Sequence, residues 1–208
     1  MNKSLLMTPI LLVCGSCFIV LSYFYIDIPL ANYCRHLHPG VRSFFGMVTE
    51  LGQSTWYLGA SLFCFLLFRY VYKNIFLARR ILFLFVAIAG SGIIVNIFRF
   101  LAGRYRPEML FTQGAYGFEF FQIKSNALSF PSGHTTTAFA LAMVLIIFWR
   151  RYWPFFVFLA TLIAASRVII TAHFLSDVVA GAYLGLFSVI FLKNIGDFIF
   201  YPSLKFSH

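Results

Sequence analysis

The sequence predicts an all-α membrane protein in which a single domain, residues 1–208, crosses the bilayer six times. Two observations of composition carry this prediction: 61% of the residues are hydrophobic with a mean hydropathy of +0.87, and only 11% are charged. Both values lie well outside the range of ordinary soluble domains. The third observation is that apolar runs almost free of charge recur along the chain, without an internal repeat or a low-complexity tract.

The spans are predicted from runs that approach the roughly 20 apolar residues a helix needs to cross a bilayer. They are Leu5 to Ile26, Leu51 to Phe68, Ile81 to Phe98, about Ser132 to Trp149, Tyr152 to about Ile170, and Val178 to Leu192. The first run is too long for the apolar core of a signal peptide and no small-residue cleavage site follows it, so we expect it to be retained. The last run reaches full length only if the polar residues before it lie at membrane depth.

Residues 28–50, between the first two predicted spans, form an amphipathic segment with shorter apolar runs than the spans. Their apolar side chains recur at roughly helical spacing, and Pro39-Gly40 interrupts the pattern. We therefore expect short helices that lie in the membrane interface.

The basic residues predict the orientation of the spans. The loops between spans 2 and 3 and between spans 4 and 5 contain Arg69, Lys73, Arg79, Arg80, Arg150 and Arg151, without an acidic residue. The positive-inside rule makes these loops and both termini cytoplasmic. The formal net charge of +10 is scattered in ones and twos between apolar runs, which argues against a nucleic-acid-binding surface.

Polar residues that interrupt the apolar pattern gather at the opposite ends of spans 3 to 6. They are Arg99, Arg104, Arg106, Ser132, His134, Arg167, His173 and Asp177. Ionisable groups at membrane depth are costly, so they predict a functional site, here on the outer side of the membrane.

These polar residues form three short motifs, and for two of them one of the interpretations is an anion-binding site. Arg99, followed six residues later by Arg106-Pro107, is either a pair of snorkelling arginines at a helix end or a pair of guanidiniums facing an anion. The stretch Pro131-Ser132-Gly133-His134 is either an ordinary helix start with Ser132 as N-cap or an anion site at a helix N-terminus.

The third motif is Ser166-Arg167, followed by His173 and Asp177. On a helix the i, i+4 spacing places the last two side chains on one face, so the carboxylate can accept a hydrogen bond from one ring nitrogen and direct the other outward. The alternative is a capping pair that satisfies itself. All three motifs fall on one side of the membrane, which favours the functional interpretation of each.

The order R-x6-RP, PSGH, SR-x5-H-x3-D resembles the three-part signature of the type-2 phosphatidic acid phosphatase superfamily, which includes bacterial nonspecific acid phosphatases and vanadium haloperoxidases. The motifs cover positions 99–177, and the six-span layout extends the similarity. Asp27 to Leu30 and Thr49 to Gly52 also resemble early segments of bacterial members. One departure is Arg99, because the family pattern usually begins with lysine.

The resemblance implies a lipid phosphatase with a phosphohistidine intermediate. His173 would be the nucleophile and Asp177 would fix its tautomer. His134 would protonate the leaving oxygen and then activate water. The expected phosphate-binding groups are Arg99, Arg106, Ser132, Gly133 and Arg167.

The sequence suggests no cofactor. Only six acidic residues are present, and they show no magnesium or calcium spacing, so we expect activity without a metal ion. The expected partners are the bilayer and a phosphorylated lipid, with no nucleic acid and no obligate protein partner. Undecaprenyl diphosphate, phosphatidylglycerol phosphate, phosphatidic acid and a lipid A phosphate remain candidate substrates. A lipid phosphotransferase of the same fold, and a transporter or noncatalytic anion-binding protein, remain the alternatives.

Overall fold

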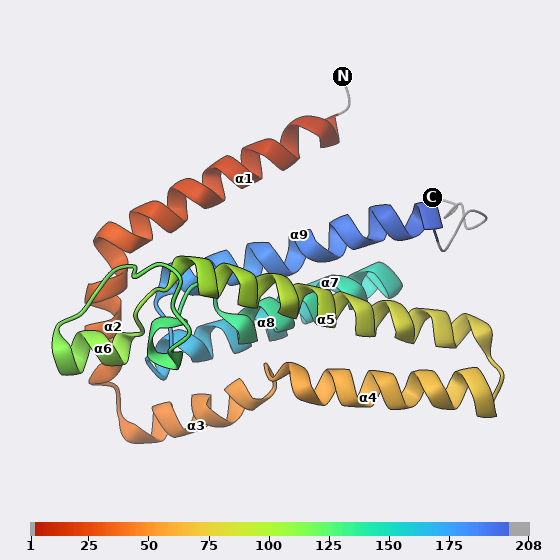
Figure 1. The fold of residues 1–208 in the computed structure, drawn as a ribbon, viewed down its shortest axis with the longest axis horizontal. Helices are drawn as coiled ribbons and strands as arrows, with labels where there is room; N and C mark the ends of the chain where they lie inside the picture. Colours follow the sequence, from red (N-terminus) through yellow and green to blue (C-terminus); the bar gives the residue numbers. More distant parts are fainter. Residues whose placement is uncertain (1–2, 200–208) are drawn as a thin grey trace.

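The computed structural model describes residues 3–199, and these residues are helical apart from turns and one long loop (Figure 1). The helices are α1 (Lys3–Leu21), α2 (Asp27–Arg35), α3 (Pro39–Glu50), α4 (Ser54–Leu66), α5 (Ile75–Ala102), α6 (Pro107–Gln113), α7 (Gly133–Phe148), α8 (Trp153–Ile169) and α9 (Leu175–Ile199). π-helical turns, Ser22–Ile26 and Leu67–Val71, prolong α1 into α2 and extend α4. The predicted all-α membrane fold is confirmed.

Five helical stretches are long and apolar enough to cross a membrane. They are Leu12–Arg35, Pro39–Val71, Ile75–Ala102, Arg150–Ile169 and Leu175–Ile195. The fourth predicted span corresponds to α7, which has only 16 residues and is about 24 Å long at 1.5 Å per residue. Six spans therefore remain a prediction, while the short helices expected on either side of Pro39 are present as α2 and α3.

The centre of the bundle is α7, which packs most extensively on α9 and α8. Its buried face consists of small side chains and threonines, Thr135 to Ala138, Ala140, Ala142 and Val144. Two glycines of α9 allow the two backbones to come close: a Cβ atom at Gly181 would lie 2.5 Å from the Ser132 carbonyl oxygen, and one at Gly185 would lie 2.4 Å from that of Thr136. Small residues spaced four apart are typical of close helix pairs in membranes.

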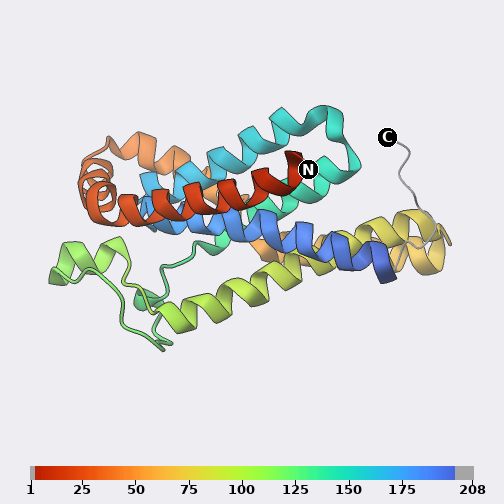
Figure 2. The same cartoon turned by 90° about the horizontal axis from the view of Figure 1, so that it is seen from above.

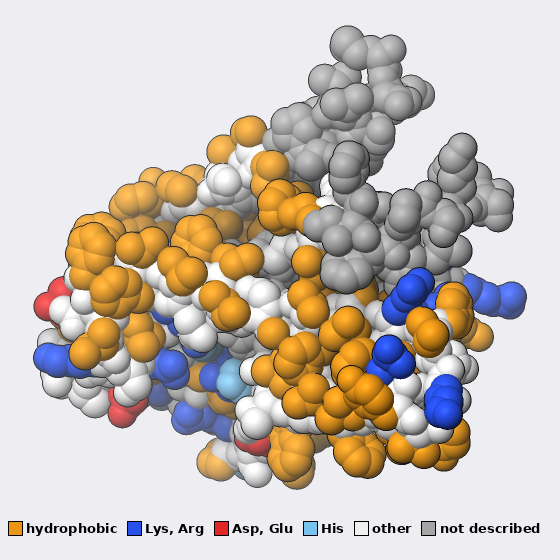
Figure 3. Space-filling model, turned by 45° about the vertical axis from the view of Figure 1, so that its right-hand side comes forward, with side chains coloured by type: hydrophobic (Ala, Val, Ile, Leu, Met, Phe, Trp, Pro, Cys, Tyr) orange, Lys and Arg blue, Asp and Glu red, His pale blue; other side chains and the backbone are white. Residues whose placement is uncertain are grey.

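The bundle has two chemically different ends. The end of α5 and the starts of α7 and α9 meet at one end, together with the loop between α5 and α7 (Figures 1 and 2). The basic turns between α4 and α5 and between α7 and α8 lie at the other end, as do the start of α1 and the end of α9. The flank between them is largely apolar (Figure 3), with exposed aromatic side chains such as Trp56 and Phe63. This arrangement fits a protein surrounded by lipid tails.

Candidate active site

The predicted site residues converge at helix ends of one end of the bundle. Arg99 is in the last turn of α5, Arg106 precedes α6, Ser132, Gly133 and His134 begin α7, Arg167 is in the last turn of α8, and His173 and Asp177 flank the start of α9. Helix termini carry backbone groups and partial charges that a packed bundle presents toward the same region. The structure therefore brings together residues that lie far apart in the sequence.

His173 has the environment of a nucleophile. Its side chain is 1% exposed, and its Nε2 atom has no hydrogen-bond partner among residues 3–199. Burial lowers the pKa of His173 to about 3, so the ring is neutral at physiological pH. A neutral imidazole with an unengaged ring nitrogen can attack an electrophile.

The predicted helical pairing of His173 with Asp177 is wrong in geometry. α9 begins only at Leu175, because the chain turns at Thr171, whose φ is 57°. Asp177 Oδ2 lies 3.7 Å from His173 Nδ1, which is too far for a hydrogen bond. It instead accepts from the backbone N–H of Phe174 at 2.9 Å, so the carboxylate caps the helix.

Three guanidiniums of the site have little compensation from the protein. Arg99 Nε donates to the Pro131 carbonyl at 2.9 Å, and Arg167 Nη1 donates to Thr49 Oγ1 at 2.6 Å. The Nε atoms of Arg106 and Arg167 are buried without a partner in the part of the chain that the structure describes. None of the three forms an ion pair with a carboxylate among the described residues. Buried cations in this condition favour binding of an anion.

The start of α7 packs closely against Arg99. A Cβ atom at Gly133 would lie 2.9 Å from Arg99 Nη2, so any side chain there would displace the guanidinium. Ser132 is fully buried at the N-cap position, but its side chain makes no capping bond, and its hydroxyl accepts from Thr135 at 3.1 Å. Ser132 is therefore the N-cap residue, as predicted, but it does not cap the helix through its side chain.

His134 faces an opening beside this helix start. A pocket of about 240 Å³ is lined by Gly52, Gln53, Ser54, Thr55, Arg99, Gly133, His134 and Thr137. Its walls come from the turn between α3 and α4, the end of α5 and the start of α7. On the surface shown in Figure 3, a histidine and several basic side chains likewise gather between apolar surfaces. His134 can therefore meet a ligand that the arginines hold.

Sequence reasoning did not include Ser129 and Asp27 among the site residues, and it left Arg104 as a polar residue of no stated role. All three are buried: Ser129 and Arg104 are 0% exposed and Asp27 is 1% exposed. Ser129 Oγ donates to Asp177 Oδ2 at 2.6 Å, and Arg104 bonds both Asp27 and Asp177. The available signals were the position of Arg104 between the two motif arginines and the resemblance of Asp27 to Leu30 to an early family segment, whereas Ser129 had none.

The described residues contain no group of three or more histidine, cysteine, aspartate or glutamate side chains placed to hold a metal ion. The carboxylates near the site are engaged by Arg104, Ser129 and backbone N–H groups. The positive charge of this site is carried by arginine side chains.

Comparisons with known proteins identify the family. The PAP2 superfamily matches residues 80–200. A lipid A 1-phosphatase of Rhizobium johnstonii is 32% identical over 149 residues, which cover 67% of this chain but only 61% of that relative. Among solved structures, LpxE of Aquifex aeolicus has a TM-score of 0.62 at 24% identity, covering 84% of this chain and 98% of its own.

A second solved structure extends the similarity to almost the whole fold. The PAP2-type phosphatidylglycerolphosphate phosphatase of Bacillus subtilis has a TM-score of 0.65 at 19% identity, covering 96% of this chain and 98% of its own. The matched region from residue 80 to residue 200 includes all three motifs. The chain therefore belongs to the PAP2 superfamily.

Proposed function

We propose that this protein is a membrane phosphatase that hydrolyses a phosphomonoester or a diphosphate on a lipid. The observation that carries the proposal is the unengaged Nε2 atom of buried His173, at the end of the bundle where the three arginines and His134 also lie. Arg99, Arg106 and Arg167 all act electrostatically on His134, and Arg106 and Arg167 also act on His173. A phosphate held by these guanidiniums would therefore lie between the two histidines.

The reaction would proceed in two displacements. Nε2 of His173 attacks phosphorus and the bond from phosphorus to the lipid oxygen breaks. His134, protonated once the negative charge of the bound phosphate offsets the neighbouring arginines, gives that oxygen a proton. Water then attacks the phosphohistidine, His134 accepts the proton from water, and phosphate leaves neutral His173. The guanidiniums and the N–H groups at the start of α7 stabilise the charge on the nonbridging oxygens.

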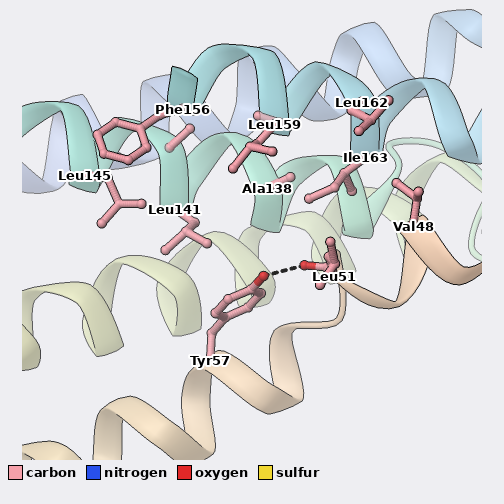
Figure 4. A pocket seen from close by; sticks show the side chains of 12 residues that line it. Val48, Leu51, Tyr57, Ala138, Leu141, Leu145, Phe156, Leu159, Leu162 and Ile163 are labelled. Carbon is pink, nitrogen blue, oxygen red and sulfur yellow. Dashed lines mark hydrogen bonds between the residues drawn. The ribbon is translucent and has the colours of Figure 1, made fainter. Parts of the chain in front are cut away.

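The lipid tail has a place beside the site. The face of α7 that begins with His134 continues into an apolar pocket of about 210 Å³ (Figure 4). Its lining is Val48, Leu51, Tyr57, Ala138, Leu141, Ala142, Leu145, Phe156, Leu159, Ala160, Leu162 and Ile163. A phosphate at the helix start and an acyl chain along this face would suit one amphipathic substrate.

Lipid A 1-phosphate is the substrate that we place first among the four candidates. The 32% identity to a lipid A 1-phosphatase supports it, while the fold of the phosphatidylglycerolphosphate phosphatase keeps glycerophospholipids in the comparison. The basic turns at the opposite end of the bundle support a location in the inner membrane, with cytoplasmic termini and a periplasmic active site.

The test measures phosphate release by the purified protein in detergent micelles with excess chelator. Wild type and His173→Ala are compared on all four candidate lipids. We expect release by wild type alone, together with an acid-labile phosphoenzyme that His173→Ala does not form. Transfer of phosphate to a second lipid without free phosphate would indicate a phosphotransferase, and inactivity on every lipid would contradict the proposal.

A further inference from the structure

Ser129 connects the histidine to the aspartate. Its hydroxyl donates to Asp177 Oδ2 at 2.6 Å and lies 3.3 Å from His173 Nδ1. A hydroxyl has one proton, so a serine that donates to the carboxylate can only accept from the ring nitrogen. This geometry favours the tautomer with the proton on Nδ1, which leaves the lone pair on Nε2.

Arg104 fixes the other carboxylate oxygen. Its Nη1 atom donates to Asp177 Oδ1 at 2.5 Å and to Ser176 Oγ at 2.6 Å, while its Nη2 atom donates to Asp27 Oδ2 at 2.7 Å. The backbone N–H of Ser176 donates to Asp27 Oδ1 at 3.0 Å. The planar guanidinium thus joins α2 to the first turn of α9 through two fully buried ion pairs.

The surroundings of Arg104 exclude water and hold it in place. The rings of Tyr23, Tyr116, Phe118 and Phe174 lie 4.7 to 5.5 Å from its Cζ atom. Its carbonyl oxygen accepts from the backbone N–H of Ser129 at 3.0 Å. The residue therefore orients Asp177 with its side chain and Ser129 with its backbone.

We propose that Ser129 and Arg104 are positioning residues for the nucleophile: Arg104 fixes Asp177, and Ser129 transmits that orientation to His173 as a hydrogen-bonded relay. The kinetic part of this inference rests on the proposed phosphatase function. The relay itself is a property of the resting protein, since it sets which ring nitrogen of His173 carries the proton. It can therefore be measured without a substrate.

The first test is spectroscopic. The full chain, labelled with ¹⁵N-histidine and held in detergent micelles, gives ¹H–¹⁵N correlation spectra that separate the two neutral tautomers. The sequence has five histidines, and the His173 signals are those that His173→Ala removes. We expect protonation at Nδ1 in wild type and a shift toward protonation at Nε2 in Ser129→Ala. An unchanged tautomer in Ser129→Ala would overturn the relay.

The second test is kinetic. Ser129→Ala should lower kcat about 100-fold, the scale expected for a misaligned catalytic group, with KM within about twofold because no phosphate contact is lost. Ser129→Thr retains the hydroxyl and should recover kcat relative to the alanine variant. The control is Ser91→Ala, which removes a similarly buried hydroxyl that donates to the Ile88 carbonyl of its own helix, and should keep wild-type kcat. Wild-type kcat in Ser129→Ala would contradict the proposal.

The third test addresses Arg104. Arg104→Lys keeps the charge but replaces a planar fork, which bonds two carboxylates, with a single ammonium. We expect a lower kcat, an unchanged KM and a mixed His173 tautomer in this variant. Should Arg104→Lys fail to fold, the two Ser129 variants still decide the inference. A silent wild type with the Nδ1 tautomer intact would refute the phosphatase and leave the positioning relay standing.

Discussion

Arg99 replaces the lysine that usually begins the first family motif. Its Nε atom bonds the Pro131 carbonyl, and its planar head lies against Gly133. Arg99→Lys should keep activity within about tenfold of wild type, because the charge toward phosphate is retained while one backbone hydrogen bond is lost. Steady-state kcat/KM measures this. Arg99→Met is the matched control and should lose far more, whereas complete loss in Arg99→Lys would show that the fork geometry is essential.

The lowered pKa of His173 predicts that the folded protein loses stability in acid. The pKa of about 3 in the folded protein lies below the ordinary value of 6.5, so the unfolded chain binds a proton more readily between these values. Stability contributed by neutral His173 is present above pH 6.5 and falls by up to about 1.4 kcal/mol per pH unit as the pH decreases toward 3. Melting temperatures at pH 7 and pH 5 should therefore differ more for wild type than for His173→Asn. Equal differences would contradict this linkage.

The motif residues could be predicted from the sequence, whereas the buried residues that hold them in position could not. Arg99, His134 and His173 stand at motif spacing and interrupt apolar runs, so their position alone marks them. Ser129 carries no such mark, because a serine before a helix is common and its complete burial follows only from tertiary packing. The direct hydrogen bond expected between His173 and Asp177 is replaced by a longer contact of 3.7 Å, because spacing cannot show that the helix begins after His173.

At the scale of the element, we expect Gly→Ala to have opposite effects on stability at Gly185, in the contact between α7 and α9, and at Gly59 on α4. In an exposed helix, Gly→Ala stabilises by roughly 1 kcal/mol, and a Cβ atom at Gly59 would meet nothing within 4 Å. At Gly185 the same Cβ atom would lie 2.4 Å from the Thr136 carbonyl, so we expect a loss of about 1–3 kcal/mol. Thermal unfolding in detergent compares the two variants. A Gly185→Ala protein as stable as Gly59→Ala would contradict the close packing.

The apolar face of α7 predicts selectivity for substrates with a tail. Leu141→Trp should fill the pocket shown in Figure 4 and lower kcat/KM for a long-chain lipid phosphate about tenfold. Hydrolysis of water-soluble p-nitrophenyl phosphate should be unchanged, because the phosphate site is untouched. Leu62→Trp, on an exposed position of α4 outside the pocket lining, is the matched control. Equal losses on both substrates would place the tail elsewhere.

The sequence predicted where helices begin and end better than it predicted where each helix lies in the bundle. The interruption at Pro39 and the start of α7 after Ser132 agree with the predictions, since proline and a helix N-terminus are local signals. The central place of α7 was not predictable, because its apolar composition is like that of the outer spans. Its position comes from small side chains that match glycines distant in the sequence.

At the scale of the whole molecule, the orientation can be tested by labelling intact cells. The four native cysteines are replaced, and single cysteines are introduced as Gln113→Cys near the site or Tyr72→Cys in the basic turn; both positions are exposed. An impermeant maleimide should label position 113 from outside and position 72 only after permeabilisation of the inner membrane. The reverse pattern would place the active site on the cytoplasmic side. Phosphate release by each variant verifies that the fold is preserved.

The ion pair between Arg104 and Asp27 shows that the site depends on residues outside the segment that the family model matches. The segment that the superfamily has in common with this protein, residues 80–200, contains every motif residue. Asp27 on α2 and Thr49 on α3 lie outside that segment, yet they bond Arg104 and Arg167 directly. A fragment limited to the common segment would bury two arginines without their partners, so we expect the smallest unit with an intact site to include the N-terminal helices as well.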